Sequence, residues 1–287
     1  MKFRLLVLFI AVASMIAAVA AWKMTAGPDA PISSSPPPAP GSSGSNERRN
    51  HHSPHLAELI NRRSVDRAHV RALGPKGFAI SRTGPLRPEG DALTRVNSLL
   101  PQSQAGDSSA TLEIFLTVLD CKQAYSKVPA VPDDTTSRRL AECEALLTNI
   151  SIADSDWLSK AAEQGNVEAK ILYSLNPTYT LPGGPKQYLK DPEAVQAWRT
   201  KSLSYLEQAV AVGSQDAMLS LSDAYKTGII VDQDAVAQLG YALAAQRLSP
   251  IPGFEDSYQP LKSSLTPAQR AEADRRATQI LTQCCKD

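Results

Sequence analysis

Histidine, the side chain that most often serves acid-base catalysis and zinc binding, occurs at only four positions of this 287-residue chain. All four lie in the first quarter of the sequence, at His51, His52, His55 and His69. A Ser-His-Asp triad, a Cys-His pair or a histidine-ligated metal site in the rest of the chain would therefore need a contribution from this early segment. The tract from His51 to His55 is interpreted either as a weak zinc or copper site or as a solvated part of a linker.

The remaining sequence carries no catalytic signature. It contains no Gly-x-Ser-x-Gly, no phosphate-binding glycine loop and no His-Glu-x-x-His. Asp and Glu number 29, so a pair of acid-base carboxylates stays open, although spacing alone selects no two of them. We therefore expect a protein that is not an enzyme and has no catalytic, cofactor-binding or metal-binding residues. A periplasmic hydrolase-like enzyme that uses carboxylates is the alternative.

Two of the four cysteines have the spacing of a structural disulfide. Cys121 and Cys143 fall on consecutive predicted helices, and Pro129, Pro132 and Asp133 predict the turn between them. Antiparallel packing of these helices would bring the sulfur atoms together, and a disulfide closing a loop of this size stabilises a fold by roughly 3 kcal/mol. The close Cys-x-x-Cys pair of redox enzymes is absent, so we predict a structural disulfide between Cys121 and Cys143.

The other two cysteines, Cys284 and Cys285, are adjacent near the C-terminus. A disulfide ring between neighbouring residues is strained. Free thiols and pairing between molecules are therefore both open for these positions.

The N-terminus predicts export from the cytoplasm. Met1-Lys-Phe-Arg is followed by an uncharged apolar run from Leu5 to Trp22. Residues 1–22 are thus either a signal peptide, with a cleavage signal ending at Ala20, or a membrane anchor formed by residues 5–22. Both alternatives place the following residues in the periplasm or another extracytoplasmic space. Residues 23–55 are rich in Pro and Ser and are predicted to be a disordered linker.

Residues 56–105 are predicted to be a basic, weakly structured segment, with one helix over residues 56–73 and a short helix over residues 92–100. Its basic residues either attract an anionic surface, such as lipid head groups, or lie on solvated faces. Nucleic acid is not expected as a partner, because the segment has a single aromatic residue, Phe78. The net charge of the whole chain is only +1, yet basic residues outnumber acidic ones from position 48 to position 95, at Arg48, Arg49, Arg62, Arg63, Arg67, Arg71, Lys76, Arg82, Arg87 and Arg95.

Beyond residue 106 the sequence indicates an all-α domain that continues to residue 287. Apolar residues recur at helical spacing, for example in residues 112–119 and 139–147, and no stretch alternates convincingly as a strand does. A closing helix is predicted over residues 265–284, because Thr266, Pro267 and Gln269 have the types and spacing of a capped helix start.

Two stretches of this domain are versions of each other. One runs from Trp157 to Ala169 and the other from Tyr205 to Ala217, and each has an aromatic residue followed by Ala, Gly and Ala at intervals of four. In each copy the glycine can end one helix in the left-handed conformation while the next side chain caps the following helix. The repetition predicts stacked helix pairs. The corner dipeptides are Gly165-Asn166 and Gly213-Ser214.

The continuation of the second copy resembles a whole repeat of the Sel-like repeat family, which is related to the tetratricopeptide repeats. The resemblance covers residues 157–248, and the first copy departs from it at Pro177 and in the long loop that follows. It implies a short α-solenoid of helix pairs that acts as a scaffold for partner proteins. The disulfide-linked hairpin predicted from the cysteine spacing would precede this solenoid. The residues that carry the resemblance in the second copy are Ala217, Leu221, Tyr225, Gly228, Val231, Asp234, Ala237, Tyr241, Ala244 and Ala245.

We therefore expect an exported or membrane-tethered protein-protein interaction scaffold of the bacterial cell envelope, whose partner proteins the sequence does not identify. A passive envelope spacer is a further alternative. Recognition concentrates in irregular loops on a rigid framework, which points to the loop between the repeats. For the tyrosines of this loop the alternative is packing over the stack. The candidate partner-binding residues are Tyr179, Lys186, Tyr188 and Lys190.

Overall fold

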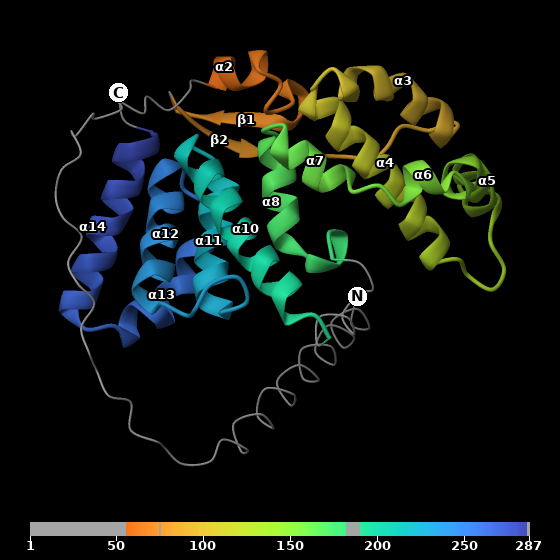
Figure 1. Ribbon diagram of the computed structural model, residues 1–287. Coiled ribbons are helices and arrows are strands. Elements are labelled where there is room, and N and C mark those ends of the chain that lie inside the picture. Colours follow the sequence, from red (N-terminus) through yellow and green to blue (C-terminus); the bar gives the residue numbers. More distant parts are fainter. Residues whose placement is uncertain (1–55, 75, 182–189, 286–287) are drawn as a thin grey trace. The chain divides into compact units, whose positions relative to one another are not determined.

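A computed structural model describes residues 56–74, 76–181 and 190–285 (Figure 1). The chain divides into two compact units, Met1–Arg49 and Asn50–Asp287, and every described residue belongs to the second. The predicted signal peptide or anchor, the linker with its histidine tract, and Lys186 and Tyr188 lie outside the described residues. No helix in the described part of the chain is long and apolar enough to cross a membrane.

Helices make up most of the described chain, as the sequence predicts, and one antiparallel hairpin of two short strands accompanies them. The strands are β1 (Val70–Leu73) and β2 (Gly77–Ile80), and short 3₁₀ turns form η1 (Arg67–His69) and η2 (Pro177–Tyr179). The α-helices are α2 (Leu56–Asn61), α3 (Ala92–Gln104), α4 (Ser108–Ser126), α5 (Asp134–Thr148), α6 (Ile150–Ala153), α7 (Trp157–Glu163), α8 (Val167–Leu175), α10 (Pro192–Ala211), α11 (Gln215–Thr227), α12 (Ala235–Leu248), α13 (Phe254–Ser264) and α14 (Pro267–Cys284).

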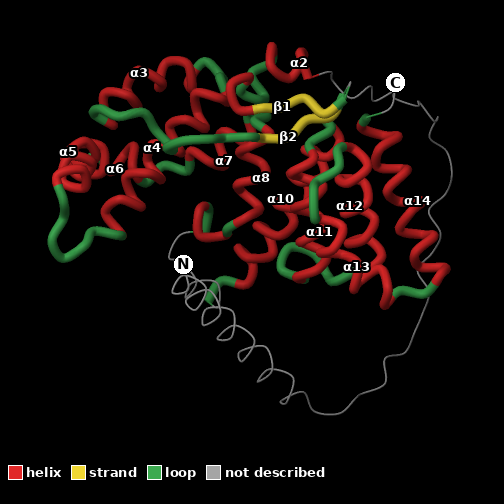
Figure 2. Tube along the Cα trace, turned by 180° about the vertical axis from the view of Figure 1, so that it is seen from behind, coloured by secondary structure: helices red, strands yellow, loops and turns green. Residues whose placement is uncertain are grey.

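Most of the long helices pack against their neighbours in the chain (Figures 1 and 2). The contacts run from α3 to α4, α7, α8, α10, α11, α12 and α14 in turn, with α5 beside α4 and α13 beside α12. Helices α8 and α10 are antiparallel, because Lys170 Nζ donates to Gln208 Oε1 at 2.9 Å and Trp198 Nε1 donates to the Tyr173 carbonyl at 3.1 Å. The turns within helix pairs and the loops between pairs therefore lie at opposite edges of these helices.

The two repeat copies turn in the same way. Gly165 and Gly213 have φ of +98° and +89°. In both copies the glycine N–H donates to the carbonyl three residues earlier, and the next N–H donates to the carbonyl five residues earlier, which is the Schellman arrangement. Asn166 and Ser214 then cap α8 and α11 by accepting from the amide three residues onward. The predicted helix end and helix start are confirmed at both corners.

The C-terminal part contains one predicted helix and one that the sequence does not indicate. Helix α14 begins with the expected capping box of Thr266 and Gln269. Helix α13 was not predicted, because the prolines of residues 249–253 mark only the break before it. Its Tyr258 packs in a small cluster with Leu239 of α12 and Ala273 of α14, so tertiary contact stabilises this helix.

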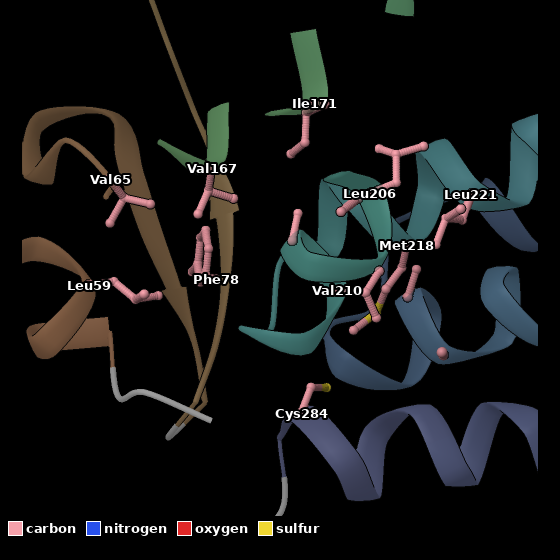
Figure 3. Close-up of a cluster of buried hydrophobic side chains, with 14 of the residues drawn as sticks. Leu59, Val65, Phe78, Val167, Ile171, Leu206, Val210, Met218, Leu221 and Cys284 are labelled. Atoms are coloured by element: carbon pink, nitrogen blue, oxygen red, sulfur yellow. The ribbon is translucent and has the colours of Figure 1, made fainter. Parts of the chain in front are cut away.

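Residues 56–105 differ from the prediction of a weakly structured segment. Helix α2 stops at Asn61 instead of residue 73, the chain then forms the hairpin, and α3 extends to residue 104. Leu59, Val65 and Phe78 are at most 4% exposed and join a core cluster with Val167 and residues of α10 and α11 (Figure 3). The segment is thus part of the second compact unit, and no domain boundary separates it from the helices beyond residue 106.

The segment of residues 64–80 hydrogen-bonds to both helix corners. The Ser64 carbonyl accepts from the N–H of Val167 at 2.8 Å, and the N–H of Phe78 donates to the Gly213 carbonyl at 3.0 Å. We call the edge formed by residues 163–167 and 211–215 the corner edge. Because β2 (Gly77–Ile80) lies between β1 and this edge, β1 is the outer strand (Figure 2).

Candidate interaction edge

The edge opposite the corners is made of the loops that join one helix pair to the next. Helix α8 ends at Leu175, α10 begins at Pro192, and the turn between α11 and α12 spans residues 228–234. We call the described residues 175–181, 190–191 and 228–234 the loop edge.

The loop edge exposes apolar side chains. Leu175 is 60% exposed and Ile229 is 58% exposed, and both are among the six strongly exposed large hydrophobic residues of the described chain. Burial of such a side chain yields about 1.5–3 kcal/mol. A partner that covers both therefore gains a substantial part of a binding free energy.

Hydrogen bonds hold the loops of this edge in place. Arg199 of α10 donates through Nε to the Ile230 carbonyl at 3.1 Å and forms an ion pair with Asp232 at 3.3 Å. On the other loop, the Asn176 side chain accepts from the N–H of Thr178 at 2.9 Å and caps η2. The exposed apolar residues are thus presented by ordered backbone.

The predicted partner-binding residues divide into three groups. Tyr179 is half-buried and packs edge-on against Phe115, with ring centroids 5.8 Å apart at 70°. Packing over the stack, the alternative for the loop tyrosines, therefore holds for Tyr179. Lys190 is exposed at the loop edge. Lys186 and Tyr188 lie outside the described residues.

Sequence reasoning missed Leu175 and Ile229. Leu175 continues the apolar pattern of α8, and Ile229 follows the glycine that ends α11. Both look like core residues in the sequence, and only the packing of the neighbouring helices reveals that they face water.

A half-buried lysine near the middle of α10 has its partners within the fold. Lys201 Nζ lies 2.6 Å from Glu163 Oε1 and 5.5 Å from the ring centroids of both Tyr173 and Tyr205. Burial of the ammonium opposes its charge, but the hydrogen bond to Glu163 and the neighbouring Tyr205 outweigh this and raise the pKa of Lys201 to about 12. The lysine is a structural cation rather than a base.

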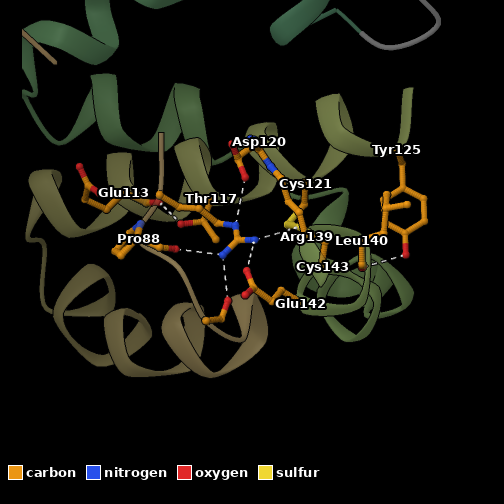
Figure 4. The surroundings of a disulfide bond; sticks show 12 residues. Pro88, Glu113, Thr117, Asp120, Cys121, Tyr125, Arg139, Leu140, Glu142 and Cys143 are labelled. Carbon is orange, nitrogen blue, oxygen red and sulfur yellow. Dashed lines mark hydrogen bonds and ion pairs between the residues drawn. A yellow bond between two sulfur atoms is a disulfide. The ribbon is translucent and has the colours of Figure 1, made fainter. Parts of the chain in front are cut away.

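The carboxylates of Asp120 and Glu142 have a structural environment as well (Figure 4). Arg87, 5% exposed, donates through Nε to Asp120 at 3.0 Å and through Nη2 to Glu142 at 2.8 Å. Arg139 also pairs with Asp120. The hydrogen bond from Arg87 lowers the pKa of Glu142, whereas a general acid needs a raised pKa. This environment disfavours acid-base catalysis by the pair.

Two clusters of metal-ligating residue types occur among the described residues. One joins Asp120 to Cys121 and Cys143, whose sulfur atoms are occupied in a disulfide. The other joins Asp66, His69 and Glu113. The Glu113 carboxylate of this second cluster is already shared between arginines 82 and 95, so neither cluster offers a free ligand set.

The structure joins both pairs of cysteines. Cys121 on α4 and Cys143 on α5 have Cα atoms 5.3 Å apart and form a disulfide between neighbouring helices (Figure 4). Cys284 and Cys285 are also joined, which is the arrangement that the sequence argument disfavours because of ring strain.

Most described arginines of the basic segment are ion-paired within the fold. Arg67 and Arg71 are exceptions: both are exposed, and neither guanidinium forms an ion pair or hydrogen bond to a described residue. Most of the positive charge in this segment is therefore paired with carboxylates of the same chain. The sequence could not indicate this pairing. The pairs are Arg62 with Glu58, Arg63 with Asp107, Arg82 with Glu113 and Glu168, Arg87 with Asp120 and Glu142, and Arg95 with Glu113.

Comparisons with known proteins yield no match: no family model, no curated protein and no solved structure corresponds to this chain.

Proposed function

We propose that this protein is an exported or membrane-tethered protein-protein interaction scaffold of the bacterial cell envelope, and that its partner docks on the loop edge. The observation that carries the proposal is the exposure of Leu175 at the end of α8 and of Ile229 in the turn after α11, both more than half exposed, beside loop segments that are fixed by hydrogen bonds. Exposed apolar side chains gathered on ordered loops are typical of interaction sites.

The repeated helix corners support a scaffold of Sel-like helix pairs. Both corners share one hydrogen-bond pattern, and consecutive helices pack on one another in chain order. Stacked pairs of this kind present extended surfaces to partner proteins. The N-terminal residues 1–22, as signal peptide or anchor, would place the scaffold in the periplasm or at the membrane.

The loop edge is tested by site-specific photo-crosslinking in the full-length protein. A photoreactive phenylalanine at position 175 or 229 should yield a discrete crosslinked species in cells, and the crosslinked protein, once purified, should bind the chain. The matched control is position 150 on α6, where Ile150 is 71% exposed but lies outside the loop edge. Crosslinking at position 150 alone would show that the partner binds outside the loop edge. The absence of a crosslink at all three positions would favour the passive spacer.

Variants then measure the energy of the contact. Leu175→Asp with Ile229→Asp should leave the melting temperature within about 2 °C of the parent, because exposed side chains contribute little to folding. The same variant should weaken binding of the purified partner by at least about tenfold, which corresponds to about 1.4 kcal/mol. Ile150→Asp should change neither quantity.

A further inference from the structure

The outer strand of the hairpin has one hydrogen-bonding edge with no occupant among the described residues. In β2, the N–H groups of Phe78 and Ile80 point away from β1, because both donate to the corner at residues 213–216. Their opposite residues in the antiparallel register are Ala72 and Val70. In an antiparallel pair, two opposite residues either both point their N–H and C=O groups toward the partner strand or both point them away from it. The N–H and C=O groups of Val70 and Ala72 therefore point outward from the hairpin.

This edge is accessible. Ala72 is exposed and Val70 is half-buried, and no hydrogen bond of the described chain reaches the outward groups of either residue. The opposite edge of the hairpin is covered by the helix corner at Gly213. Proteins generally protect an exposed strand edge, because its row of unpaired donors and acceptors is a template for another strand.

The charge beside this edge selects the kind of strand that fits. Arg71 lies within β1 and Arg67 lies three residues before it, and both are exposed and without an ion pair in the described chain. Two acidic groups lie nearby: Asp66 caps η1 and lies 3.8 Å from His69, and Asp216 accepts from the N–H of Ile80 and interacts electrostatically with Arg71. The two guanidinium groups that are exposed at the edge itself favour acidic side chains on an incoming strand.

A second copy of this chain fits the edge poorly. Two β1 strands could pair antiparallel about a twofold axis with Val70 of each copy opposite Ala72 of the other. This register would place Arg71 opposite Arg71. Like charges directly opposite each other destabilise a strand pair.

We propose that the outer edge of β1 binds an extended acidic peptide of a partner protein, which adds a third strand to the hairpin. The N–H and C=O groups of Val70 and Ala72 supply the main-chain hydrogen bonds, and Arg67 and Arg71 contact the carboxylates of the peptide. This surface is separate from the loop edge. It selects a peptide that is extended and carries acidic side chains.

The test uses the full chain and two fluorescent hexapeptides, one of alternating Val and Glu and one of alternating Val and Lys. Fluorescence anisotropy should show binding of the Val-Glu peptide only, weakened by added salt. In Ala72→Pro the outward N–H is lost while an edge position tolerates the ring, and the affinity should fall at least about tenfold. The matched control Ala72→Val keeps the N–H and should bind as the parent does.

Charge-reversed variants provide an independent arm that does not depend on proline. Arg67→Glu with Arg71→Glu should lose the Val-Glu peptide and gain the Val-Lys peptide, whereas Lys190→Glu on the loop edge should leave both unchanged. Equal binding of the two peptides to the parent, or unchanged binding in a folded Ala72→Pro variant, would overturn the proposal. Leu175→Asp with Ile229→Asp should bind the Val-Glu peptide normally, so failure here and failure of the loop-edge interface are distinguishable.

Discussion

Gly165 and Gly213 occupy equivalent positions in the two repeat copies, with φ of +98° and +89°, but their surroundings differ. A Cβ at position 165 would meet only the Ser64 hydroxyl, at 3.8 Å. A Cβ at position 213 would lie inside van der Waals contact of the Lys76 backbone carbonyl. A substitution at position 165 therefore reports only the energetic cost of the left-handed conformation. A substitution at position 213 reports this cost together with the steric clash against the hairpin backbone.

Gly165→Ala should lower the free energy of unfolding by about 1–2 kcal/mol, the usual cost of a left-handed alanine. Gly213→Ala should cost roughly 2 kcal/mol more, because the backbone of the hairpin must move. Gly213→Val should also cost more than Gly240→Val, where the added Cβ meets the Arg276 side chain at 3.1 Å without a positive φ. Urea unfolding measures all four, and equal losses at 165 and 213 would contradict the packing of the hairpin on the corner.

The pH dependence of stability offers another residue-scale test. The hydrogen bond from Arg87 lowers the pKa of Glu142, so this carboxylate stabilises the fold above its unfolded-state pKa, and that stability is lost as the pH falls through the folded-state pKa. Glu142→Gln should therefore be less stable than the parent at neutral pH and lose less stability on acidification. Urea melts from neutral pH down to about pH 3 measure the difference, and parallel curves for parent and variant would exclude the ion pair.

Among the described α-helices that are longer than α13, α5 has the smallest buried fraction of its residues. Of its 15 residues only Cys143 and Leu146 are buried. The disulfide to α4 and the contact of Arg87 with Glu142 therefore carry a large share of its attachment. Helices α11 and α12, by contrast, pack through several buried apolar residues each.

Replacement of both Cys121 and Cys143 by Ser should lower the free energy of unfolding by about 3 kcal/mol. Hydrogen exchange should accelerate first in residues 134–148 while α11 and α12 stay protected, because α5 has little else to hold it. Cys284→Ser with Cys285→Ser is the matched control, since opening a ring between adjacent residues releases almost no chain entropy. Non-reducing peptide mapping should find the 121–143 linkage, and free thiols at these two positions would rule out the disulfide.

The helix corners could be predicted from the sequence because their causes are local: a glycine, a capping side chain and an apolar face all lie within a few residues. The hairpin could not be predicted, because its strands are only four residues long and the hydrogen bonds from β2 to the helix corner join residues far apart in the chain. The N–H of Ile80 finds its acceptor on Asp216, 136 residues away. The exposure of Leu175 and Ile229 was missed for the same reason, because it depends on which helices lie beside them.

At the scale of the whole molecule, the segment before α3 binds the helical pairs together. Phe78 is fully buried in a cluster with residues of α8, α10, α11 and α14. Arg82 bridges Glu113 of α4 and Glu168 of α8, with both ion pairs at 2.9 Å. A polypeptide that begins near residue 106 would expose this cluster and leave the two carboxylates without their common partner.

We therefore expect residues 50–287 to unfold in one cooperative transition, and residues 106–287 to melt at a clearly lower temperature. Phe78→Ala in the longer fragment should by itself cost about 3–5 kcal/mol. Circular dichroism and calorimetry on the two fragments provide the measurement. Equal melting temperatures would mean that the helices beyond residue 106 form an independent domain.

The hydrogen bond between Ile80 and Asp216 also fixes an order of events during biosynthesis. Ribosomes add about 5–20 residues per second, so the 136 residues between these positions take roughly 7–27 s to appear. During that interval Phe78 has no corner on which to pack, and the nascent hairpin is too short to be stable alone. The hairpin therefore packs on its corner only after α11 has been synthesised, which leaves Phe78 and its neighbours available to a chaperone during that interval.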